Sequence, residues 1–329
     1  MNNAITDVPG FRVGHAQDIG AATGCTVILC PPETVGGVDI RGSAAGTRQI
    51  DSLQPFHFVD EVHAILLSGG SAYGLDASGG VMQYLEERSI GYQTSAGRVP
   101  IVPTAIIYDL GLGDGKVRPD KQMGYQACEN AQAGPVALGS VGAGTGASVG
   151  KLYSIRFATK GGVGSASVTC ASGLIVGALV VVNAFGDVVD PRDQRILAGA
   201  RDPLNPDRFA DSAARIKAGV GMPAWNRGIQ NTTLGVVATN AKLSKRQAIK
   251  ISQMAQSGLV RTISPVHSTV DGDLVFALGA GEKTEDVNTV GMMAEEALAA
   301  AVLRAVQAAD GMGLLPAYRD LHPPENHVS

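Results

Sequence analysis

The residues of this chain best suited to chemistry lie at one junction, where Asn231-Thr232-Thr233 is followed at once by an apolar run over residues 234–239. The composition of that run favours a β-strand, so the hydroxyl of Thr232 is expected just before a buried strand. If the bond between Asn231 and Thr232 were cut, Thr232 would carry a hydroxyl nucleophile and a free α-amine base in one residue. An α-amine has a reference pKa of about 7.7–8.0, which suits general-base catalysis near neutral pH. The same residues are also compatible with a plain loop that enters a strand.

Other polar residues stand at the ends of predicted strands. Asn183 ends one long apolar run, and Tyr108 stands near the end of another. Asp271 and Asp273 flank a glycine immediately before a third apolar run. Such a pair is compatible with a solvated turn or with a polar site beside the strand, and the residue types alone leave both open. Four histidines, His15, His57, His63 and His267, show no spacing typical of metal ligands and are predicted to be core or edge residues.

Two glycine-rich segments have features of anion-binding loops. Residues 142–151 resemble a loose dinucleotide fingerprint and the end of a phosphate loop. The phosphate loop needs a glycine where this chain has Thr145 and a serine or threonine where it has Leu152, so a nucleotide site is the disfavoured alternative. In residues 69–74, backbone N–H groups at a turn and a helix start serve either an oxyanion or close packing.

The chain alternates predicted strands with predicted helices. Ser244 and Gln247 form a capping box at the start of one helix, which is predicted to end at Gly258. A second, alanine-rich helix is predicted over residues 287–309. The polar stretch 187–230 is predicted to be a surface connection with one short helix. Strands are predicted over residues 25–30, 62–68, 101–110, 165–169, 174–182, 234–239 and 274–278. This alternation indicates an α/β protein with helices packed on sheets.

The composition excludes several function classes. With 329 residues, 45% hydrophobic and 17% charged, the chain is long and apolar enough for a large globular core. Its net charge of −4 gives no basic footprint for nucleic acid. The 4 cysteines lack metal-ligand spacing, so buried free thiols are expected. The N-terminus lacks the pattern of a signal peptide, and no apolar run is long enough to span a membrane, so we expect a soluble cytoplasmic protein without a membrane partner.

Six motifs in a fixed order resemble a known family, the DmpA-like aminopeptidases and their relatives, the NylC-type nylon-oligomer hydrolases. The motifs are Gly-Gly-Ser-Ala-Tyr-Gly-Leu (69–75), Ala-Ile-Ile-Tyr-Asp-Leu (105–110), Gly-Ala-Ser-Val-Gly-Lys (146–151), Val-Val-Val-Asn (180–183), Asn-Thr-Thr-Leu (231–234) and Asp-Gly-Asp (271–273). The resemblance implies an N-terminal-nucleophile hydrolase built as a four-layer αββα sandwich, with residues 1–329 as a single hydrolase domain. It also implies a precursor that cuts itself into an α chain (1–231) and a β chain (232–329), which assemble into a homotetramer of such pairs.

The resemblance assigns the site residues position by position. Thr232 matches the nucleophile, and Asn231 precedes it at the cleavage site. The residues expected around the nucleophile are Tyr108, Lys151, Asn183, Asp271 and Asp273. The aspartate pair matches the nylon-hydrolase branch, whereas the aminopeptidase branch typically uses serine and lacks this Asp-Gly-Asp arrangement. At these positions the chain departs from the aminopeptidases.

The expected activity is hydrolysis of a linear amide or peptide bond, possible substrates being 6-aminohexanoate (nylon) oligomers, through an acyl-enzyme on Thr232 Oγ. The Thr232 α-amine, or a group coupled to it, is expected to accept the hydroxyl proton, and Asp271 and Asp273 are expected to orient the ammonium form of that amine. Lys151 is expected to help hold charge. Asn183 is the expected oxyanion donor, and Tyr108 is expected to position the substrate or to donate a proton. Gly228 is expected to supply backbone freedom for self-cleavage.

Two other activities within the same fold remain open. An exo-acting aminopeptidase or D-amidase of the DmpA type would need a pocket for a free substrate amine. An acyltransferase of the ornithine-acetyltransferase type also uses an internal threonine and would transfer the acyl group to an added amine. In every case the partner is a small amide or peptide substrate, and neither a metal nor an organic cofactor is expected.

Overall fold

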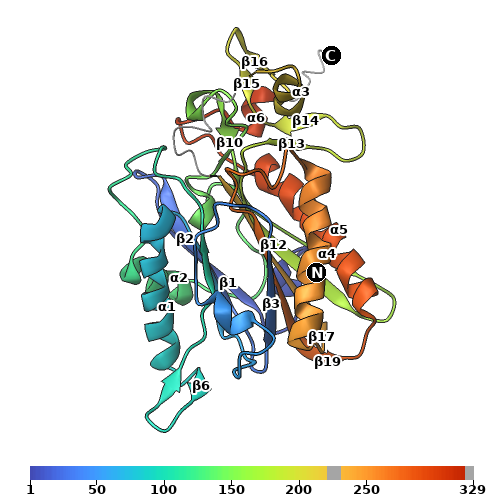
Figure 1. The fold of residues 1–329 in the computed structure, drawn as a ribbon. Helices are drawn as coiled ribbons and strands as arrows, with labels where there is room; N and C mark the ends of the chain where they lie inside the picture. Colours follow the sequence, from blue (N-terminus) through green and yellow to red (C-terminus); the bar gives the residue numbers. More distant parts are fainter. Residues whose placement is uncertain (221–230, 323–329) are drawn as a thin grey trace, which may run out of the picture.

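The computed structural model describes residues 1–220 and 231–322, and its architecture rests on two β-sheets that lie face to face. The main helices are α1 (Ala77–Glu86), α2 (Lys121–Glu129), α4 (Lys245–Thr262) and α5 (Val287–Gln307). Figure 1 shows α1 and α2 on the outer side of one sheet and α4 and α5 on the outer side of the other. The layers therefore follow the order helices, sheet, sheet, helices. This confirms the expected αββα sandwich.

The first sheet has the strand order β1-β2-β5-β8-β4. Its strands are β1 (Arg12–Asp18), β2 (Thr23–Leu29), β5 (Ala64–Ser68), β8 (Thr104–Ile106) and β4 (Thr47–Arg48). Neighbouring strands are antiparallel except β5 and β8, which run parallel. Every residue of β2 and β5 is buried. A strand that is apolar on both faces needs cover on both faces, here from α1 and α2 outside and from the second sheet inside.

The second sheet has the strand order β11-β12-β17-β19-β3. Its strands are β11 (Gly162–Thr169), β12 (Ile175–Asn183), β17 (Thr232–Ala241), β19 (Leu274–Lys283) and β3 (Val35–Ile40). Only β17 and β19 are parallel, and α4 lies between them in the chain as their crossover helix. Because β17 is the central strand of this sheet, it has a neighbouring strand on each side, β12 and β19.

Three hydrophobic clusters hold the four layers together. The cluster between the sheets includes Ile28, Ile65, Leu179 and Phe276, all fully buried. A second cluster joins α4 and α5 to the second sheet, and a third joins α1 and α2 to the first sheet. Aliphatic side chains dominate all three clusters, as the low aromatic content predicts.

The start of α4 confirms the predicted capping box, while its predicted end is wrong. The Ser244 hydroxyl accepts the Gln247 N–H at 3.4 Å, and the Gln247 carboxamide accepts the Ser244 N–H at 2.9 Å. The helix passes Gly258 and ends at Thr262. A Cβ at Gly258 would lie 2.6 Å from the Glu295 carbonyl oxygen of α5. The glycine therefore serves the close approach of two helices and does not terminate one.

The polar stretch after β12 contains more regular structure than predicted. It forms four short strands, which belong to two small sheets, and one short helix, gathered at one end of the sandwich in Figure 1. The elements are β13 (Asp187–Val189), β14 (Ile196–Ala198), β15 (Arg201–Asp202), β16 (Asn205–Phe209) and α3 (Ser212–Lys217), and β13 also pairs with β18 (Ile263–Ser264). The buried Asp187 carboxylate accepts the Ala200 and Ser212 N–H groups at 2.8 and 2.7 Å, which ties the segment together. Gly228 lies outside the described residues.

The apolar run over residues 101–110 is a strand only at β8, so Tyr108 and Asp109 lie in the loop that follows. The glycine turn before α1 packs around this loop: Gly70 donates its N–H to the Asp109 carboxylate at 2.7 Å. A Cβ at Gly69 would lie 2.1 Å from the same carboxylate. The turn therefore serves close packing and holds an anion that belongs to the chain itself.

The remaining elements are short. They are β6 (Tyr92–Gln93), β7 (Arg98–Val99), β9 (Ser148–Val149), β10 (Thr159–Lys160), α6 (Tyr318–Leu321) and the 3₁₀ turns Ile5–Asp7, Ile50–Leu53, Ser71–Asp76, Gly142–Gly144 and Ile155–Phe157. Within residues 1–220 and 231–322, no helix combines the length and the apolar character needed to cross a membrane.

Candidate active site

The Asn231-Thr232 junction lies where the central strand of the second sheet begins. Thr232 is the first residue of β17, is 1% exposed, and stands opposite Asn183 in the antiparallel pairing with β12. Asn231 forms a parallel bridge with Asp271 just before β19. The junction therefore has a predicted site residue on each side, because β12 and β19 are the two neighbours of β17.

The carbonyl group of Asn231 is held by two donors. The Thr232 hydroxyl donates to the Asn231 carbonyl oxygen at 2.5 Å, and the Gly272 N–H donates to the same oxygen at 2.7 Å. The Asn231 N–H donates to the Val270 carbonyl at 3.0 Å. In the continuous chain, the hydroxyl of Thr232 thus lies against the carbonyl group of the preceding peptide bond, and that carbonyl is polarised by a backbone N–H.

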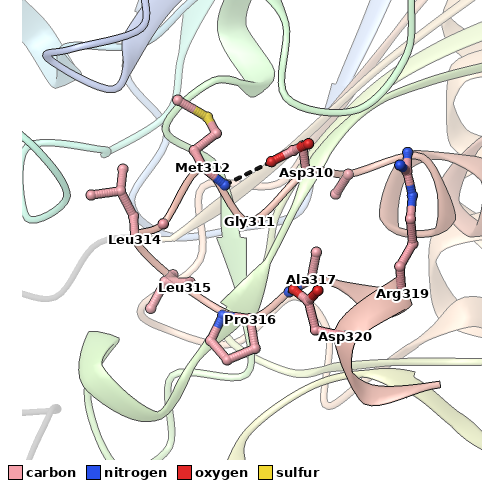
Figure 2. Close-up of a pocket in the computed structure, with 11 residues that line it drawn as sticks. Asp310, Gly311, Met312, Leu314, Leu315, Pro316, Ala317, Arg319 and Asp320 are labelled. Carbon is pink, nitrogen blue, oxygen red and sulfur yellow. Dashed lines mark hydrogen bonds between the residues drawn. The ribbon is translucent and has the colours of Figure 1, made fainter. Parts of the chain in front are cut away.

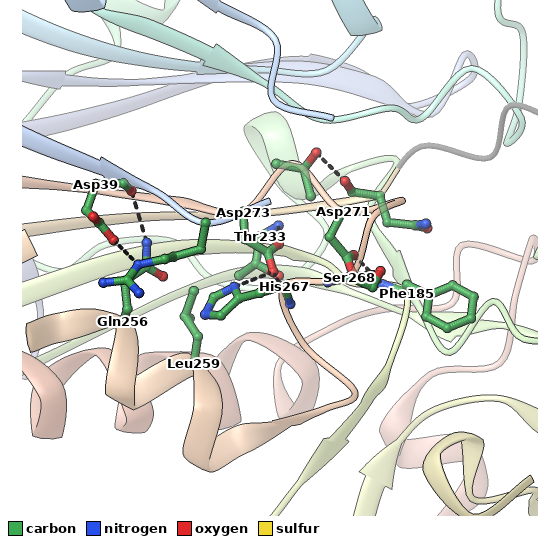
Figure 3. A network of polar contacts seen from close by, with 12 residues as sticks. Asp39, Phe185, Thr233, Gln256, Leu259, His267, Ser268, Asp271 and Asp273 are labelled. Carbon is green, nitrogen blue, oxygen red and sulfur yellow. Dashed lines mark hydrogen bonds and ion pairs between the residues drawn. The ribbon is translucent and has the colours of Figure 1, made fainter. Parts of the chain in front are cut away.

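Both carboxylate oxygens of Asp273 accept hydrogen bonds, and one of these bonds comes from the residue that follows Thr232. One carboxylate oxygen accepts the Thr233 N–H at 2.6 Å. The other accepts the His267 backbone N–H at 3.1 Å and the His267 Nδ1 at 3.0 Å. Figure 3 shows His267 and Asp273 of the loop that precedes β19 next to Thr233 of β17. His267 is the residue that sequence reasoning missed, since it was assigned no role beyond the core or an edge.

Asp271 is held in a similar way on the other side of Gly272. One oxygen accepts the Phe185 N–H at 3.1 Å, and the other accepts the N–H and hydroxyl of Ser268 at 3.1 and 2.5 Å (Figure 3). Burial raises the pKa of Asp271 to about 6, and the nearby charge of Asp273 acts in the same direction. Asp271 and Asp273 are each 1% exposed, so of the two possibilities for this pair the solvated turn is wrong.

Lys151 and Asn183 form a second buried unit. The Lys151 ammonium donates to the carbonyls of Ser148 and Asn183 at 2.7 and 3.0 Å and to the Asn183 side-chain oxygen at 3.0 Å. Burial lowers the pKa of Lys151 to about 7, although the charges of Asp271 and Asp273 act to raise it. A lysine with this pKa exchanges its proton near neutral pH, which is a property of functional sites.

Both polar atoms of the Asn183 side chain form hydrogen bonds to neighbouring backbone groups. Its oxygen accepts the Ser148 N–H at 3.1 Å, and its Nδ2 donates to the backbone carbonyl of Tyr108 at 3.2 Å. In the continuous chain, therefore, the Asn231 carbonyl accepts hydrogen bonds from the Gly272 N–H and the Thr232 hydroxyl, and not from Asn183. Tyr108 is brought to the cluster by its backbone, and its side chain is half-buried.

The glycine-rich segment 142–151 packs inside the molecule and carries Lys151 to the cluster. A Cβ at Gly142 would lie 2.3 Å from the Thr26 hydroxyl of β2, and one at Gly144 would lie 2.5 Å from the Val163 N–H group of β11. The segment therefore packs closely against both sheets. These contacts explain its glycines without a nucleotide.

A second buried lysine supports the same segment. Lys160 is fully buried and donates to the carbonyls of Gly144 and Ala147 at 3.1 and 3.0 Å. Burial lowers the pKa of Lys160 to about 7, and the negative charge of Asp109 partly opposes this effect.

Lys160→Met is expected to flatten the pH dependence of stability. The folded-state pKa of Lys160, about 7, lies below its ordinary value of 10.5. Between these pH values the unfolded chain binds more protons, so the free energy of unfolding rises with pH. The contribution is complete above pH 10.5 and is lost as the pH falls through 7. Melting temperatures of wild type and variant across this range measure the difference. Lys116→Met, at an exposed lysine, should keep the wild-type slope; a Lys160→Met slope as steep as wild type would contradict the assignment.

Gly42 sets the backbone path of the aspartate pair. Its N–H donates to the Asp273 carbonyl at 3.1 Å. A Cβ at this position would lie 2.3 Å from both the Asp271 carbonyl oxygen and the Asp273 backbone nitrogen. The loop that carries both carboxylates thus approaches Gly42 too closely for any side chain.

Gly42→Ala is therefore expected to displace the Asp271–Asp273 loop and to lower stability by about 1–3 kcal/mol, as overpacking does. Denaturant unfolding measures the loss. Gly111→Ala is the matched control, because a Cβ there meets nothing within 4 Å. Equal free energies of unfolding in the two variants would show that the Asp271–Asp273 loop accommodates the added methyl group without a loss of stability.

A pocket of about 590 Å³ lies elsewhere, along the loop between α5 and α6. Figure 2 shows its lining, in which Met312 donates its N–H to the Asp310 carboxylate at 2.8 Å. The residues that line it belong to the segment 309–320, and none is a predicted site residue. Within the part of the chain that the structure describes, no group of three or more His, Cys, Asp or Glu residues is arranged to hold a metal ion.

Comparison with known proteins decides the family. The model of peptidase family S58 matches residues 3–316 of this chain. The chain belongs to peptidase family S58. An uncharacterised aminopeptidase of Mycobacterium tuberculosis is 45% identical over 351 aligned residues, which cover 98% of this chain and 98% of that protein. A 6-aminohexanoate-oligomer endohydrolase of Kocuria sp. is 32% identical over 286 residues, which cover 84% of this chain and 74% of that protein. This family S58 member is a hydrolase, as the resemblance implies.

Solved structures of the same fold support the architecture. A β-aminopeptidase of Burkholderia sp. superposes with a TM-score of 0.70 at 22% identity, covering 98% of this chain and 92% of that one. The L-aminopeptidase D-Ala-esterase/amidase of Ochrobactrum anthropi, a variant of the N-terminal-nucleophile hydrolase fold, also has a TM-score of 0.70 at 22% identity, covering 94% and 87%. The family S58 chain therefore has the N-terminal-nucleophile hydrolase fold.

Proposed function

We propose that this family S58 hydrolase is a self-processing amidohydrolase with Thr232 as its nucleophile. One observation carries the proposal: the Thr232 hydroxyl donates at 2.5 Å to the Asn231 carbonyl, which also accepts the Gly272 N–H. The junction is buried, so water is excluded until the peptide bond opens. The surrounding carboxylates and the Lys151 ammonium supply charge in a region of low dielectric, where such groups act strongly.

Self-cleavage would proceed by an acyl shift. Thr232 Oγ attacks the Asn231 carbonyl carbon, the Oγ–C bond forms, and the peptide C–N bond breaks. The Oγ proton passes to the departing nitrogen, which becomes the free α-amine of Thr232. Water then hydrolyses the ester, leaving the Asn231 carboxylate and the free hydroxyl. Gly272 N–H is placed to stabilise the oxyanion of the first step, because it already binds that carbonyl oxygen.

Turnover would repeat this chemistry on a substrate amide. The Thr232 α-amine accepts the hydroxyl proton and delivers it to the leaving amine, and the acyl group rests on Oγ until water removes it. Asp273 lies one residue from the new N-terminus through Thr233, and it supplies negative charge near the ammonium form. Burial lowers the pKa of Lys151 to about 7, so this lysine can gain or lose its proton near neutral pH.

Two substrate classes are supported by relatives, and they differ in one chemical requirement. The Kocuria relative is named for endohydrolysis of 6-aminohexanoate oligomers, and the mycobacterial relatives are named aminopeptidases. An aminopeptidase must bind the free amine of its substrate, whereas an endohydrolase needs no free terminus. Asp271 and Asp273 already use both carboxylate oxygens on protein donors, which favours substrates without a required amine. We therefore propose linear amides as the substrate class.

The intact mass of freshly purified protein under denaturing conditions tests self-processing. Two fragments that meet at Asn231 and Thr232 are expected. A single chain near 33.7 kDa after long incubation would overturn the proposal. Substrate class is tested with 6-aminohexanoate oligomers and aminoacyl amides, each with a free and an acetylated amine. Cleavage of the acetylated forms supports the endohydrolase, an absolute need for the free amine supports the aminopeptidase, and acyl transfer to an added amine in preference to water would indicate an acyltransferase.

A further inference from the structure

We propose that His267 and Ser268 form a two-residue clamp that positions the aspartate pair for self-processing, an inference that rests on the proposed function. Each residue donates two hydrogen bonds to one oxygen of one aspartate. His267 uses its backbone N–H and Nδ1 on Asp273, at 3.1 and 3.0 Å. Ser268 uses its backbone N–H and hydroxyl on Asp271, at 3.1 and 2.5 Å. Two consecutive residues thus hold the two carboxylates that flank Gly272.

The clamp determines which oxygen of Asp273 faces the junction. A carboxylate accepts hydrogen bonds on both oxygens and can exchange them by rotating. With one oxygen bound to the two His267 donors, the other is left for the Thr233 N–H, which it accepts at 2.6 Å. Because an ionised carboxylate offers only acceptors, the imidazole proton lies on Nδ1 in this contact. His267 therefore fixes the rotation of Asp273 without touching Thr232.

The backbone of the clamp supports the same role. His267 has φ of +55°, in the left-handed region that non-glycine residues seldom occupy. This conformation aims its N–H and its side chain at the same carboxylate oxygen, as the two distances require. An unfavourable conformation is retained when the surrounding structure determines it, and such positions cluster at functional sites. Figure 3 shows His267 and Ser268 in the loop that leads to β19, with Asp271 and Asp273 next to them.

His267 and Ser268 are positioning residues and not catalytic ones. Their hydrogen bonds within the described residues go to Asp273 and Asp271, and none goes to Asn231 or Thr232. Their effect must pass through the aspartates. Restoring the donor at the same place should then restore function, even when the ring or the hydroxyl itself is replaced.

The test compares the rate of self-cleavage in matched variants, followed by intact mass. His267→Ala and Ser268→Ala each remove a donor to a charged group and should slow cleavage about 10- to 100-fold. His267→Asn places an amide donor where Nδ1 stands, and Ser268→Thr keeps the hydroxyl. Both should stay within about tenfold of wild type, because the bond to the carboxylate is retained. His63→Ala is the control, since His63 is also buried against a carboxylate, Glu61 at 3.4 Å, but lies just before β5 of the first sheet.

Each outcome decides between a clamp and a merely structural loop. Wild-type rates in both alanine variants would overturn the proposal while leaving the proposed function intact. Equal slowing by His267→Asn and His267→Ala would also overturn it, because the donor would then not matter. If His267→Ala fails to fold, His267→Gln replaces it; its donor lies one carbon farther out, and cleavage as fast as in His267→Asn would count against the clamp. An uncleaved wild type would overturn the proposed function and this inference together.

Discussion

Thr232→Ala is expected to remain one chain near 33.7 kDa and to lose amide hydrolysis by about 10⁶-fold, the cost of removing the nucleophile in a serine protease. Both effects have one cause, because the same hydroxyl attacks the Asn231 carbonyl in processing and the substrate carbonyl in turnover. Intact mass measures the first effect, and hydrolysis of small amides measures the second. The fold should persist, because alanine still pairs with Asn183 in the sheet.

The neighbouring threonine provides the matched control. Thr233 is also buried, and its hydroxyl has no hydrogen-bond partner within the described residues. Thr233→Val keeps the shape and removes only that hydroxyl, so processing should continue. Thr232→Ser keeps a hydroxyl nucleophile and should also be processed. A Thr232→Ala chain that still splits at this junction would exclude the mechanism.

Asp273→Asn is expected to have the second largest effect, with processing slowed about 10³-fold and folding destabilised by about 3–5 kcal/mol. The wild-type carboxylate accepts three N–H donors, one from Thr233 and two from His267. Asparagine offers one acceptor oxygen and one NH₂ group, so the NH₂ must face a backbone N–H on one side or the other. The His267 ring can change its tautomer, but a backbone N–H cannot. The negative charge beside the new N-terminus is lost as well.

Time courses of intact mass and denaturant unfolding measure the two effects of Asp273→Asn. Asp207→Asn is the control, since Asp207 is exposed on the small sheet at the end of the sandwich. Wild-type processing by Asp273→Asn would show that neither the charge nor the orientation of this carboxylate matters. A variant that is as stable as wild type yet unprocessed would instead assign Asp273 to the chemistry alone.

Several features were predictable because they depend on residues close together in the chain. The capping box of Ser244 and Gln247 joins residues three apart. The strand next to Thr232 was predicted from the apolar run 234–239, although β17 already begins at Thr232. The strand–helix alternation indicated an α/β protein, and the family motifs implied the αββα architecture. The predicted end of α4 at Gly258 was wrong because this glycine packs against α5, and the local sequence does not contain that contact.

The sequence by itself determined the junction, the strand behind it and the polar residue types available around it. Only the tertiary structure decided that Asp271 and Asp273 are buried, that the Thr233 N–H meets Asp273 forty residues away, and that His267 holds that carboxylate. The physical reason is that strands and helices follow from local periodicity and backbone hydrogen bonding. The pKa of Lys151, the exposure of a carboxylate and the partner of a histidine depend on which distant segments pack together. Solvent exclusion by the four layers, and not the residue types, turned these side chains into a site.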